Sequence, residues 1–378
     1  MKVGLVVPGF SAGEQDWCIP ALLDYVRVLA RRVELHVFAL RYPYRRDGYR
    51  VYEARVQPFG AAQGRGARSA RLWAGVLAAL RAEHRRSRFD LLHAFWADEP
   101  GMLVALASRL LGVPAVVSLA GGELARLPEI GYGGQLRAVE RAKTRLALRF
   151  AERVTAGSHS LLGLARPHVG AGRAEKLRYT PLGVDLDLFS PPTARVEPRP
   201  APFRLLNVAS LVPVKDHALL FHALRHARDA GLEATLTLVG TGPLEADLRH
   251  LATELGITRS VTFSGSVRRE HLPRYYHDAG LFVLSSRHEA QCLAVLEAAA
   301  CGKPVIGTAV GVVPELAPDV ARVVPVGDPR ALGEAIVQAA RGEKQTCMSQ
   351  VARDRVQRGY GLEDCVGRFY SLYHELLG

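Results

Sequence analysis

The sequence predicts an α/β fold composed of two doubly wound domains. Short apolar runs alternate with helical patterns along the chain, and a proline-rich segment at residues 191–202 interrupts this alternation midway. The length of 378 residues also exceeds the size of one ordinary hydrophobic core. Because the apolar runs have the length of strands that are buried on both faces, we expect parallel sheets with right-handed crossovers.

The first half, residues 1–190, alternates strand and helix patterns from its beginning. We expect strands at Val3–Pro8, Val33–Leu40, Leu91–Phe95, Ala115–Leu119, Arg153–Ala156 and Leu177–Pro181. We expect helices at Ile19–Arg31, Ala70–Arg86, Gly101–Leu111, Gln135–Ala151 and Ser158–His168. This half therefore forms the first predicted domain.

The alternation restarts after the proline-rich segment, whose prolines prevent regular structure and indicate an interdomain linker. Further strands are expected at Leu205–Ala209, Thr235–Val239, Val261–Ser264, Leu281–Ser285, Pro304–Thr308 and Arg322–Val326. Helices are expected at Asp216–Asp229, Leu244–Leu255, Glu270–Asp278, Leu293–Cys301 and Arg330–Arg341. Residues 203–360 thus form the second predicted domain. A last amphipathic helix within 361–378 is expected to dock on the first domain.

The composition excludes several classes of protein. With 48% hydrophobic and 23% charged residues, the chain is globular rather than disordered. No stretch approaches the roughly 20 apolar residues of a membrane span, and the run Val3–Val7 is too short for a signal peptide. The five cysteines are odd in number and contain no C-x-x-C pair, which argues against a disulfide framework and a structural zinc site. We therefore expect a cytoplasmic protein.

The positive charge is concentrated in the first half. Residues 1–190 carry 28 Lys and Arg against 17 Asp and Glu, whereas residues 191–378 carry 21 against 20. Between Arg41 and Arg88 there are 12 arginines and three acids. A solvated arginine-rich surface and a surface for anionic lipid or an acidic acceptor both explain this charge, and no nucleic-acid motif accompanies it. The apolar stripe of the helix at Ala70–Arg86 suits either a membrane interface or packing on the sheet.

The strongest sign of chemistry lies between Ser285 and Val305, where an apolar strand leads through a polar loop into a helix. The free backbone N–H groups around Gln291–Leu293 suit a phosphate, because the helix dipole favours negative charge there. Glu289 precedes the helix, and Glu297 in its second turn is able to accept hydrogen bonds from two ribose hydroxyls. Either glutamate alone is explained more simply as a solvated side chain. Together, at a strand-to-helix switch, they favour a function.

The E-x7-E spacing of Glu289 and Glu297, followed by Cys-Gly-Lys-Pro, resembles the signature of the retaining family-four glycosyltransferases (glycosyl transferases group 1). Other segments resemble that family in the expected order, and these are Tyr179–Phe189, Leu206–Asp216, Val239–Pro243 and Val310–Glu315. The resemblance runs almost the whole length of the chain. It implies the GT-B fold, in which two Rossmann-like domains face each other across a substrate cleft.

The resemblance also implies roles for residues of the second domain. Glu289 is expected to contact the donor sugar, Glu297 the ribose, and Lys215 the diphosphate. The expected role of Lys215 is physically reasonable, because a fixed cation stabilises the leaving nucleotide as it gains negative charge. The remaining donor-binding residues are expected to be Ser210, Gly240, Gly242, Ser266, Val267, Gln291, Cys292 and Leu293.

Three positions depart from the family pattern. Ser210 stands where the family has an arginine, so Lys215 has to neutralise more of the diphosphate charge. The segment Ala290–Cys292 replaces a common Gly-Phe-Gly. Ala120 stands where the family has a histidine near the reacting carbon. The two alternatives are that the substrate's own phosphate and the acceptor serve as proton partners, or that His93 compensates. A packed core histidine is the simpler interpretation of His93.

The first domain is expected to bind the acceptor. Its candidate residues follow the expected strands and are Gly13, His93, Gly121, Gly122 and Glu123. The loop around Gly13 is not a G-x-G-x-x-G motif, which disfavours a nicotinamide cofactor. Because Lys215 is expected to neutralise the diphosphate, we expect no metal ion and no cofactor.

The resemblance therefore implies a retaining transferase that moves a hexosyl unit from a nucleoside-diphosphate sugar to an acceptor. A lipid-linked acceptor or an envelope glycan precursor is the candidate, at the inner face of the membrane. A nucleotide-sugar epimerase on the same fold is the alternative among enzymes. The alternative that is not an enzyme is a catalytically impaired sugar-nucleotide-binding protein, which Ala120 and Ser210 suggest.

Overall fold

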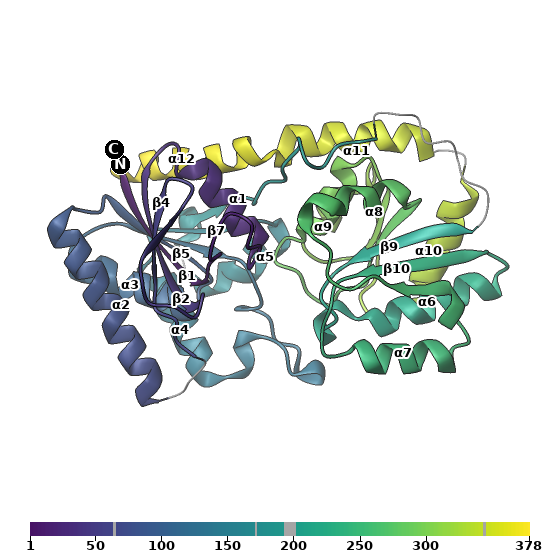
Figure 1. Cartoon of the computed structure of the whole chain (residues 1–378), viewed down its shortest axis with the longest axis horizontal. Helices are drawn as coiled ribbons and strands as arrows, with labels where there is room; N and C mark the ends of the chain where they lie inside the picture. The colour runs from purple at the N-terminus through teal and green to yellow at the C-terminus, as the bar shows by residue number, and fades with distance from the viewer. Residues whose placement is uncertain (63–65, 171, 193–201, 343–344) are drawn as a thin grey trace. The chain divides into compact units, whose positions relative to one another are not determined.

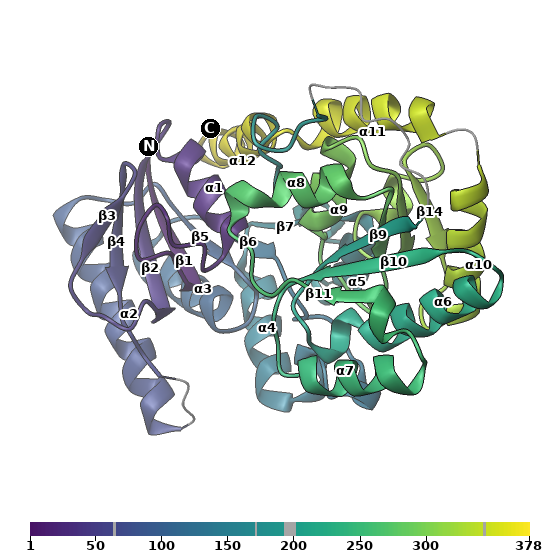
Figure 2. The same cartoon turned by 45° about the vertical axis from the view of Figure 1, so that its right-hand side comes forward.

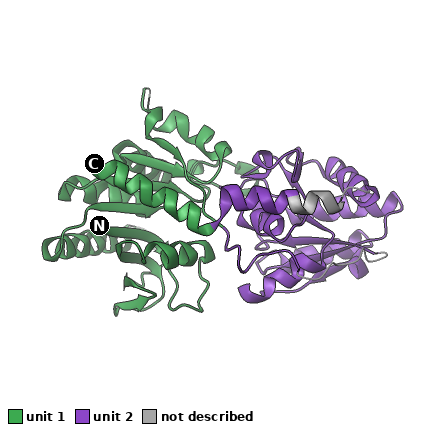
Figure 3. Cartoon of the chain, turned by 90° about the horizontal axis from the view of Figure 1, so that it is seen from above, with its two compact units in different colours: residues 1–183, 362–378 green, residues 184–361 purple. Residues whose placement is uncertain are grey.

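The computed structural model describes residues 1–62, 66–170, 172–192, 202–342 and 345–378 (Figure 1). The chain divides into two compact units, which Figure 3 shows in separate colours. The first unit comprises residues 1–183 and 362–378, and the second comprises residues 184–361.

The first unit is built on an eight-stranded sheet of order β3-β4-β2-β1-β5-β6-β7-β8. The strands are β1 (Lys2–Gly9), β2 (Glu34–Tyr42), β3 (Tyr49–Val51), β4 (Ala54–Pro58), β5 (Leu91–Phe95), β6 (Ala115–Leu119), β7 (Arg153–Ala156) and β8 (Leu177–Tyr179). The helices are α1 (Pro20–Leu29), α2 (Ala67–Arg86), α3 (Glu99–Leu111), α4 (Ala138–Phe150), α5 (His159–Ala165) and α12 (Leu362–Leu377). All neighbouring strands are parallel except β3 and β4. The winding direction changes between β1 and β5.

Both faces of this sheet are buried by helices. Leu5 and Val7 of β1 lie in a core shared with α1 and α12, while Val6 lies in a second core shared with α2 and α3. Figure 1 shows these two helix pairs on opposite faces of the sheet. Every residue of β5 and β6 is buried, which is typical of central strands in a parallel sheet.

The second unit contains a six-stranded parallel sheet of order β11-β10-β9-β12-β13-β14. The strands are β9 (Phe203–Val208), β10 (Ala234–Val239), β11 (Val261–Phe263), β12 (Leu281–Leu284), β13 (Val305–Thr308) and β14 (Ala321–Val324). The helices are α6 (His217–Asp229), α7 (Glu245–Glu254), α8 (Leu272–Asp278), α9 (Leu293–Ala300), α10 (Pro329–Arg341) and α11 (Gln345–Tyr360). Helices α6 and α10 cover one face of the sheet, and α8 and α9 cover the other (Figure 2). Here the winding direction changes between β9 and β12.

The units do not divide where the proline-rich segment suggests. The boundary lies at Gly183–Val184 instead of residue 190, because the following residues pack with the second unit. Phe189 is fully buried there, and Arg353 Nη1 donates a hydrogen bond to its carbonyl oxygen at 2.6 Å. The expected linker at 191–202 falls largely on residues 193–201, outside the described residues. Helix α12 belongs to the first unit.

Three elements differ from the sequence-based expectations. The hairpin of β3 and β4 and the helix α11 have no predicted counterpart, and β4 falls within the arginine-rich run. The apolar stripe of α2 packs on the sheet, with Leu72, Val76 and Leu80 buried. This stripe is therefore part of the core rather than a surface for a membrane interface. In the part of the chain that the structure describes, no helix combines the length and apolarity that a bilayer crossing requires.

Candidate functional site

The winding of the second-unit sheet brings two predicted site residues together. Ligands of doubly wound sheets bind beyond the strand ends at the point where the winding direction changes. Lys215 follows β9 and Glu289 follows β12, and these two strands are neighbours at that point. Although 74 residues separate them, Lys215 Nζ lies 2.5 Å from Glu289 Oε1. The two catalytic candidates thus form one ion pair.

Serine hydroxyls hold this ion pair in position. Ser286 Oγ donates a hydrogen bond to Glu289 Oε1 at 2.7 Å, and Ser285 Oγ donates to the Lys215 carbonyl oxygen at 2.8 Å. Both serines are fully buried. The loops after β9 and β12 are therefore joined by buried polar contacts, which favours one fixed arrangement of the charged groups.

Two other basic side chains near Lys215 have different roles. His217 is buried, and burial together with the Lys215 charge lowers the pKa of His217 to about 4. His217 is therefore neutral at pH 7. Arg287 Nε pairs with Asp216 Oδ2 at 2.7 Å, while Asp216 Oδ1 accepts the Leu219 N–H and caps α6. Lys215 is thus the cation that faces Glu289.

Glu297 lies in the second turn of α9, as the sequence predicts. Its Oε2 accepts a hydrogen bond from the Tyr276 hydroxyl at 2.7 Å. Leu293 begins the helix, and Cys292 precedes it with a φ of 75°. That left-handed backbone favours glycine, which is the residue that the resembling family has at the position of Cys292. The Gln291 carbonyl oxygen accepts the Val312 N–H at 2.9 Å and ties this turn to the loop after β13.

Gly240 and Gly242 are required by close backbone packing. A Cβ atom at Gly240, whose φ is 138°, would lie 2.1 Å from the Ala209 carbonyl oxygen. A Cβ atom at Gly242 would lie 2.4 Å from the Leu211 carbonyl oxygen. Glycine therefore allows the loop after β10 to touch the loop that leads to Lys215.

The remaining donor-site candidates lie at the same edge of the sheet. Ser210 is the second residue after β9 and is exposed. Ser266, which is exposed, and Val267, which is partly buried, follow β11. The Gly240 N–H donates to the Gly265 carbonyl oxygen at 2.9 Å, which links the loops after β10 and β11. The second unit therefore assembles the predicted donor residues along the carboxyl ends of its strands.

In the first unit, Glu123 organises the backbone. It is 4% exposed and accepts N–H groups from Ala97, Ala120 and Gly121 at 3.1, 3.2 and 2.8 Å. These bonds join the loops after β5 and β6. The structure thus assigns the carboxylate of Glu123 to loop geometry, whereas the sequence placed this residue beside the sugar or acceptor.

Close packing also requires glycine at positions 121 and 122. A Cβ atom at Gly121 would lie 2.5 Å from Trp96 Nε1, and one at Gly122 would lie 2.6 Å from the Tyr132 ring. Gly13 differs, because among the described residues, apart from Gly13 and its two chain neighbours, no atom lies within 4 Å of where a Cβ atom would be. Gly13 lies in the loop after β1, next to the winding switch of this sheet.

His93 is a core residue, so its expected role beside the sugar is wrong. It is fully buried, with Nδ1 2.6 Å from the Tyr373 hydroxyl and Nε2 2.7 Å from Ser118 Oγ. Burial lowers the pKa of His93 to about 3, so the ring stays neutral. A neutral ring with both nitrogens engaged inside the core has no access to a substrate.

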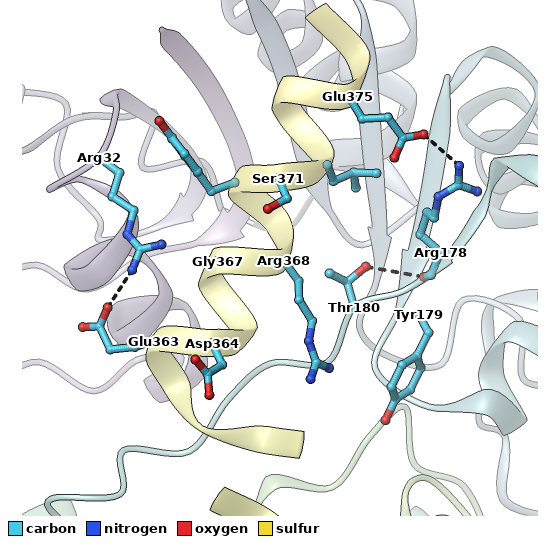
Figure 4. A pocket seen from close by; sticks show the side chains of 12 residues that line it. Arg32, Arg178, Tyr179, Thr180, Glu363, Asp364, Gly367, Arg368, Ser371 and Glu375 are labelled. Carbon is cyan, nitrogen blue, oxygen red and sulfur yellow. Dashed lines mark hydrogen bonds and ion pairs between the residues drawn. The ribbon is translucent and has the colours of Figure 1, made fainter. Parts of the chain in front are cut away.

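A pocket of about 550 Å³ also lies in the first unit, along α12 (Figure 4). Arg32 pairs with Glu363 at 3.0 Å, and Arg178 pairs with Glu375 at 2.9 Å across its lining. The basic and acidic side chains of the lining balance, so the pocket offers no net charge to a ligand. None of the predicted site residues lines it.

Comparison with protein families identifies the chain. A model of glycosyl transferases group 1 matches residues 194–355, and a model of glycosyltransferase family 4 matches residues 21–188. Between them the two models account for both units. The chain belongs to the group 1 glycosyltransferases.

Curated relatives match this glycosyltransferase over part of their length. The GDP-mannose-dependent alpha-(1-6)-phosphatidylinositol monomannoside mannosyltransferase of Mycobacterium tuberculosis is 37% identical over 158 residues, covering 38% of this chain and 41% of the relative. The D-inositol 3-phosphate glycosyltransferase of Mycolicibacterium gilvum is 31% identical over 259 residues, covering 64% of this chain and 55% of the relative. The matches thus span about half the length of these relatives.

Solved structures share the fold of this glycosyltransferase over its whole length. Sucrose-phosphate synthase from Thermosynechococcus elongatus superposes with a TM-score of 0.79 at 22% identity, covering 100% of this chain and 99% of the other. Anabaena Alr3699/HepE in complex with UDP-glucose gives 0.76 at 19% identity, with 100% of both chains covered. The predicted GT-B fold class is confirmed. At these identities the likeness shows the fold alone.

The sequence of this glycosyltransferase did not predict the positions of two polar residues, Tyr276 and Asp98. Tyr276 contacts Glu297 from α8, and no spacing rule connects the two residues. Asp98 lies at the start of α3, and burial, followed by the charges of Glu123 and Glu140, raises its pKa to about 7. Only the fold brings Glu123 and Glu140 near Asp98, so no sequence pattern predicts the raised pKa of Asp98.

Proposed function

We propose that this glycosyltransferase moves a hexosyl unit from a nucleoside-diphosphate sugar to an acceptor hydroxyl, with retention of the anomeric configuration. The observation that carries the proposal is the meeting of Lys215 and Glu289 at the winding switch of the second sheet. Glu297, on the helix that follows Glu289, completes the expected donor set. Retention rests on the family resemblance of the E-x7-E segment.

The proposed chemistry needs stabilisation of a leaving group. The bond between the anomeric carbon and the diphosphate oxygen breaks, and a bond from the acceptor oxygen forms on the same face of the sugar. The acceptor proton passes to the departing phosphate oxygen, which keeps atoms and charges balanced. Lys215 would stabilise the charge that grows on the diphosphate, and a fixed cation costs no reorganisation at that moment. Glu289 would bind hydroxyl groups of the sugar.

The names of the relatives support a donor and an acceptor class. One relative is GDP-mannose-dependent and acts on a phosphatidylinositol mannoside, and another is named for D-inositol 3-phosphate. A solved structure of the same fold holds UDP-glucose. We therefore propose a GDP- or UDP-linked hexose as donor, and a lipid-linked or envelope glycan precursor as acceptor.

The test is a transfer assay with a panel of GDP- and UDP-sugars. Thermal stabilisation by free nucleoside diphosphates first selects the base, because a ligand that binds only the folded state raises the melting temperature. Release of nucleoside diphosphate is then measured, and NMR of the product gives the anomeric configuration. We expect a product with the anomeric configuration of the donor.

Other outcomes of this assay separate the alternatives. Inversion at the anomeric carbon would contradict the retaining mechanism. Isotope exchange at C2 of the sugar without transfer would indicate an epimerase. Stabilisation by a nucleotide sugar, with neither hydrolysis nor transfer, would indicate the catalytically impaired binding protein that Ala120 and Ser210 suggest.

We also propose that transfer needs no metal ion. The support is the Lys215 ammonium group beside Glu289, which is a fixed cation available to the diphosphate. The D-x-D pair of the sequence, Asp185 and Asp187, lies outside the expected donor site, and Asp185 Oδ1 accepts the N–H groups of Asp187 and Leu188 in a local turn. We expect turnover to survive incubation with EDTA. Loss of activity in EDTA, with recovery after addition of Mg²⁺ or Mn²⁺, would contradict this proposal.

The proposed acceptor suggests a contact with an anionic membrane surface. In the first unit a groove of about 650 Å³ lies between the loop after β4 and the start of α2, and Arg46, Arg68 and Arg71 line it beside Phe59 and Ala61. Within the described part of the chain, no acidic residue lines this groove. Guanidinium groups over an apolar floor suit a phosphate attached to an apolar group. We propose this groove, here called the arginine groove, as the membrane contact.

A further inference from the structure

Tyr276 is a buried polar residue behind the proposed donor site. Its side chain is fully buried in the second unit, on α8. Its hydroxyl reaches out of an apolar environment to Glu297 Oε2 at 2.7 Å. Burial of a hydroxyl is unfavourable unless it forms a hydrogen bond, so the Glu297 carboxylate stabilises this position of the tyrosine.

Two aromatic rings hold the Tyr276 side chain in place. The ring of Phe189 lies 5.9 Å from it in an edge-to-face arrangement, and the ring of Phe282 lies 5.9 Å away on β12. Both neighbours are fully buried. Close packing restricts the rotamers of a buried ring, so the position of the hydroxyl is set by the core rather than by solvent.

The hydroxyl acts as the donor in this contact. Burial, followed by the Glu297 charge, keeps the pKa of Tyr276 well above its usual value, so the phenol retains its proton. A hydrogen bond from a neutral hydroxyl to a carboxylate is stronger than one between neutral groups. The bond therefore fixes the direction of the Glu297 carboxylate in the second turn of α9.

We propose that Tyr276 is a positioning residue for ribose recognition, acting through Glu297. The proposal rests on the proposed function, in which the Glu297 carboxylate binds the ribose hydroxyls of the donor. A carboxylate held by one oxygen presents its remaining hydrogen-bonding capacity in a fixed direction, which reduces the ordering cost of ligand binding. Tyr276 itself touches no substrate, so it adds specificity for the ribose without taking part in the reaction.

The experiment compares two ligands in matched variants. The ligands are the nucleoside diphosphate that the wild type binds best among UDP, GDP, ADP and TDP, and its 2′,3′-dideoxy analogue. Tyr276→Phe removes only the hydroxyl, and Tyr275→Phe makes the same change on the neighbouring residue of α8. Glu297→Gln serves as the reference for loss of the ribose contact. Calorimetry gives the Kd of each ligand for each variant, and urea unfolding checks that each variant is folded.

We expect Tyr276→Phe to weaken binding of the ribonucleotide about tenfold and to leave binding of the dideoxy analogue unchanged. Tyr275→Phe should bind both ligands as the wild type does. In the double variant with Glu297→Gln, Tyr276→Phe should have little further effect, since both changes act on the same contact. A merely structural role for Tyr276 would not change the preference between the two ligands.

Three results would overturn the inference. If Tyr276→Phe weakens the binding of both ligands equally, the hydroxyl stabilises the fold and has no role in ribose recognition. If Glu297→Gln abolishes the preference for ribose while Tyr276→Phe keeps it, the donor site stands and the positioning role fails. If Glu297→Gln itself keeps the preference, the ribose role in the proposed function fails, and the positioning role fails with it.

Discussion

At the residue scale, substitutions of Lys215 and Glu297 test whether the proposed site binds the donor nucleotide. Lys215 lies in the loop after β9 and Glu297 lies on α9, and each is expected to contact a different part of the nucleotide. Lys215→Ala removes the ammonium group that faces Glu289, and Glu297→Ala removes the carboxylate that Tyr276 holds. One charge-assisted contact contributes about 1.5–3 kcal/mol. We therefore expect each variant to bind nucleoside diphosphate about tenfold more weakly, or worse, by calorimetry.

The matched controls are Arg330→Ala and Glu334→Ala. These residues form an exposed ion pair on α10 of the same unit, at 2.9 Å. Their removal should leave the nucleotide affinity unchanged, because exposed pairs contribute little. Full affinity in both Lys215→Ala and Glu297→Ala would mean that the donor binds elsewhere.

Asp98 makes the stability of the first unit dependent on pH. Burial, followed by the Glu123 and Glu140 charges, raises the pKa of Asp98 to about 7, although Lys143 and the Glu99 N–H oppose the shift. A carboxyl whose pKa is raised by folding stabilises the folded state at low pH, and this contribution is lost as the pH rises through 7. Asp98→Asn should therefore raise the free energy of unfolding relative to the wild type by up to about 3 kcal/mol more at pH 8 than at pH 5.

Urea unfolding at the two pH values measures this difference. Asp47→Asn is the control, since Asp47 is an exposed aspartate of the same unit. A stabilisation by Asp98→Asn of equal size at pH 5 and pH 8 would show that Asp98 ionises normally in the folded protein.

At the element scale, α12 completes the core of the first unit although it comes last in the sequence. Phe369 is 1% exposed, and its ring lies 5.1 Å from that of Tyr25, 5.7 Å from that of His93 and 6.0 Å from that of Phe95. Phe369→Ala leaves a cavity between α12 and the sheet. We expect a loss of about 3–5 kcal/mol in the free energy of unfolding, measured by urea denaturation.

Tyr44→Ala is the control for this prediction. Tyr44 is an aromatic residue of the same unit with 77% exposure, so its removal should change stability by less than about 0.5 kcal/mol. If Phe369→Ala is equally mild, α12 contributes little to the first unit and its docking is loose.

At the scale of the whole molecule, the net positive charge is concentrated in the first half of the chain, whereas basic and acidic residues nearly balance in the second half. Each basic residue near an anionic membrane contributes about 1 kcal/mol, and salt screens the attraction beyond about 8 Å at physiological strength. We expect the protein to sediment with anionic vesicles, but not with zwitterionic ones, and to dissociate as salt is raised. Removal of the charges that line the arginine groove, in the triple variant Arg46→Gln, Arg68→Gln and Arg71→Gln, should weaken binding about tenfold or more.

A second triple variant distinguishes the groove from overall charge. Arg85→Gln, Arg86→Gln and Arg88→Gln remove the same charge from exposed positions in the last turn of α2 and just after it. Equal losses in the two triple variants would mean that net charge, and not the arginine groove, binds the membrane. Equal binding to both kinds of vesicle, or binding to neither, would contradict the membrane contact itself.

Periodicity predicted most of the elements because it records burial directly. The ranges expected for β5, β6 and β7 agree with the structure, since each is a short run between two helical patterns and β5 and β6 are mostly apolar. Periodicity failed at β3 and β4, where strands of three and five residues lie within an arginine-rich run. It also left the apolar stripe of α2 with two explanations, because an apolar face looks the same whether a sheet or a lipid covers it.

The sequence by itself determined the fold class, the family, and the residues expected at the donor site, because each depends on local pattern and spacing. Only the tertiary structure decided which of these residues meet. It paired Lys215 with Glu289, placed Tyr276 behind Glu297, and buried His93 in the core. The physical reason is that the order of strands in the sheet determines these contacts. Local sequence does not specify which strands lie side by side.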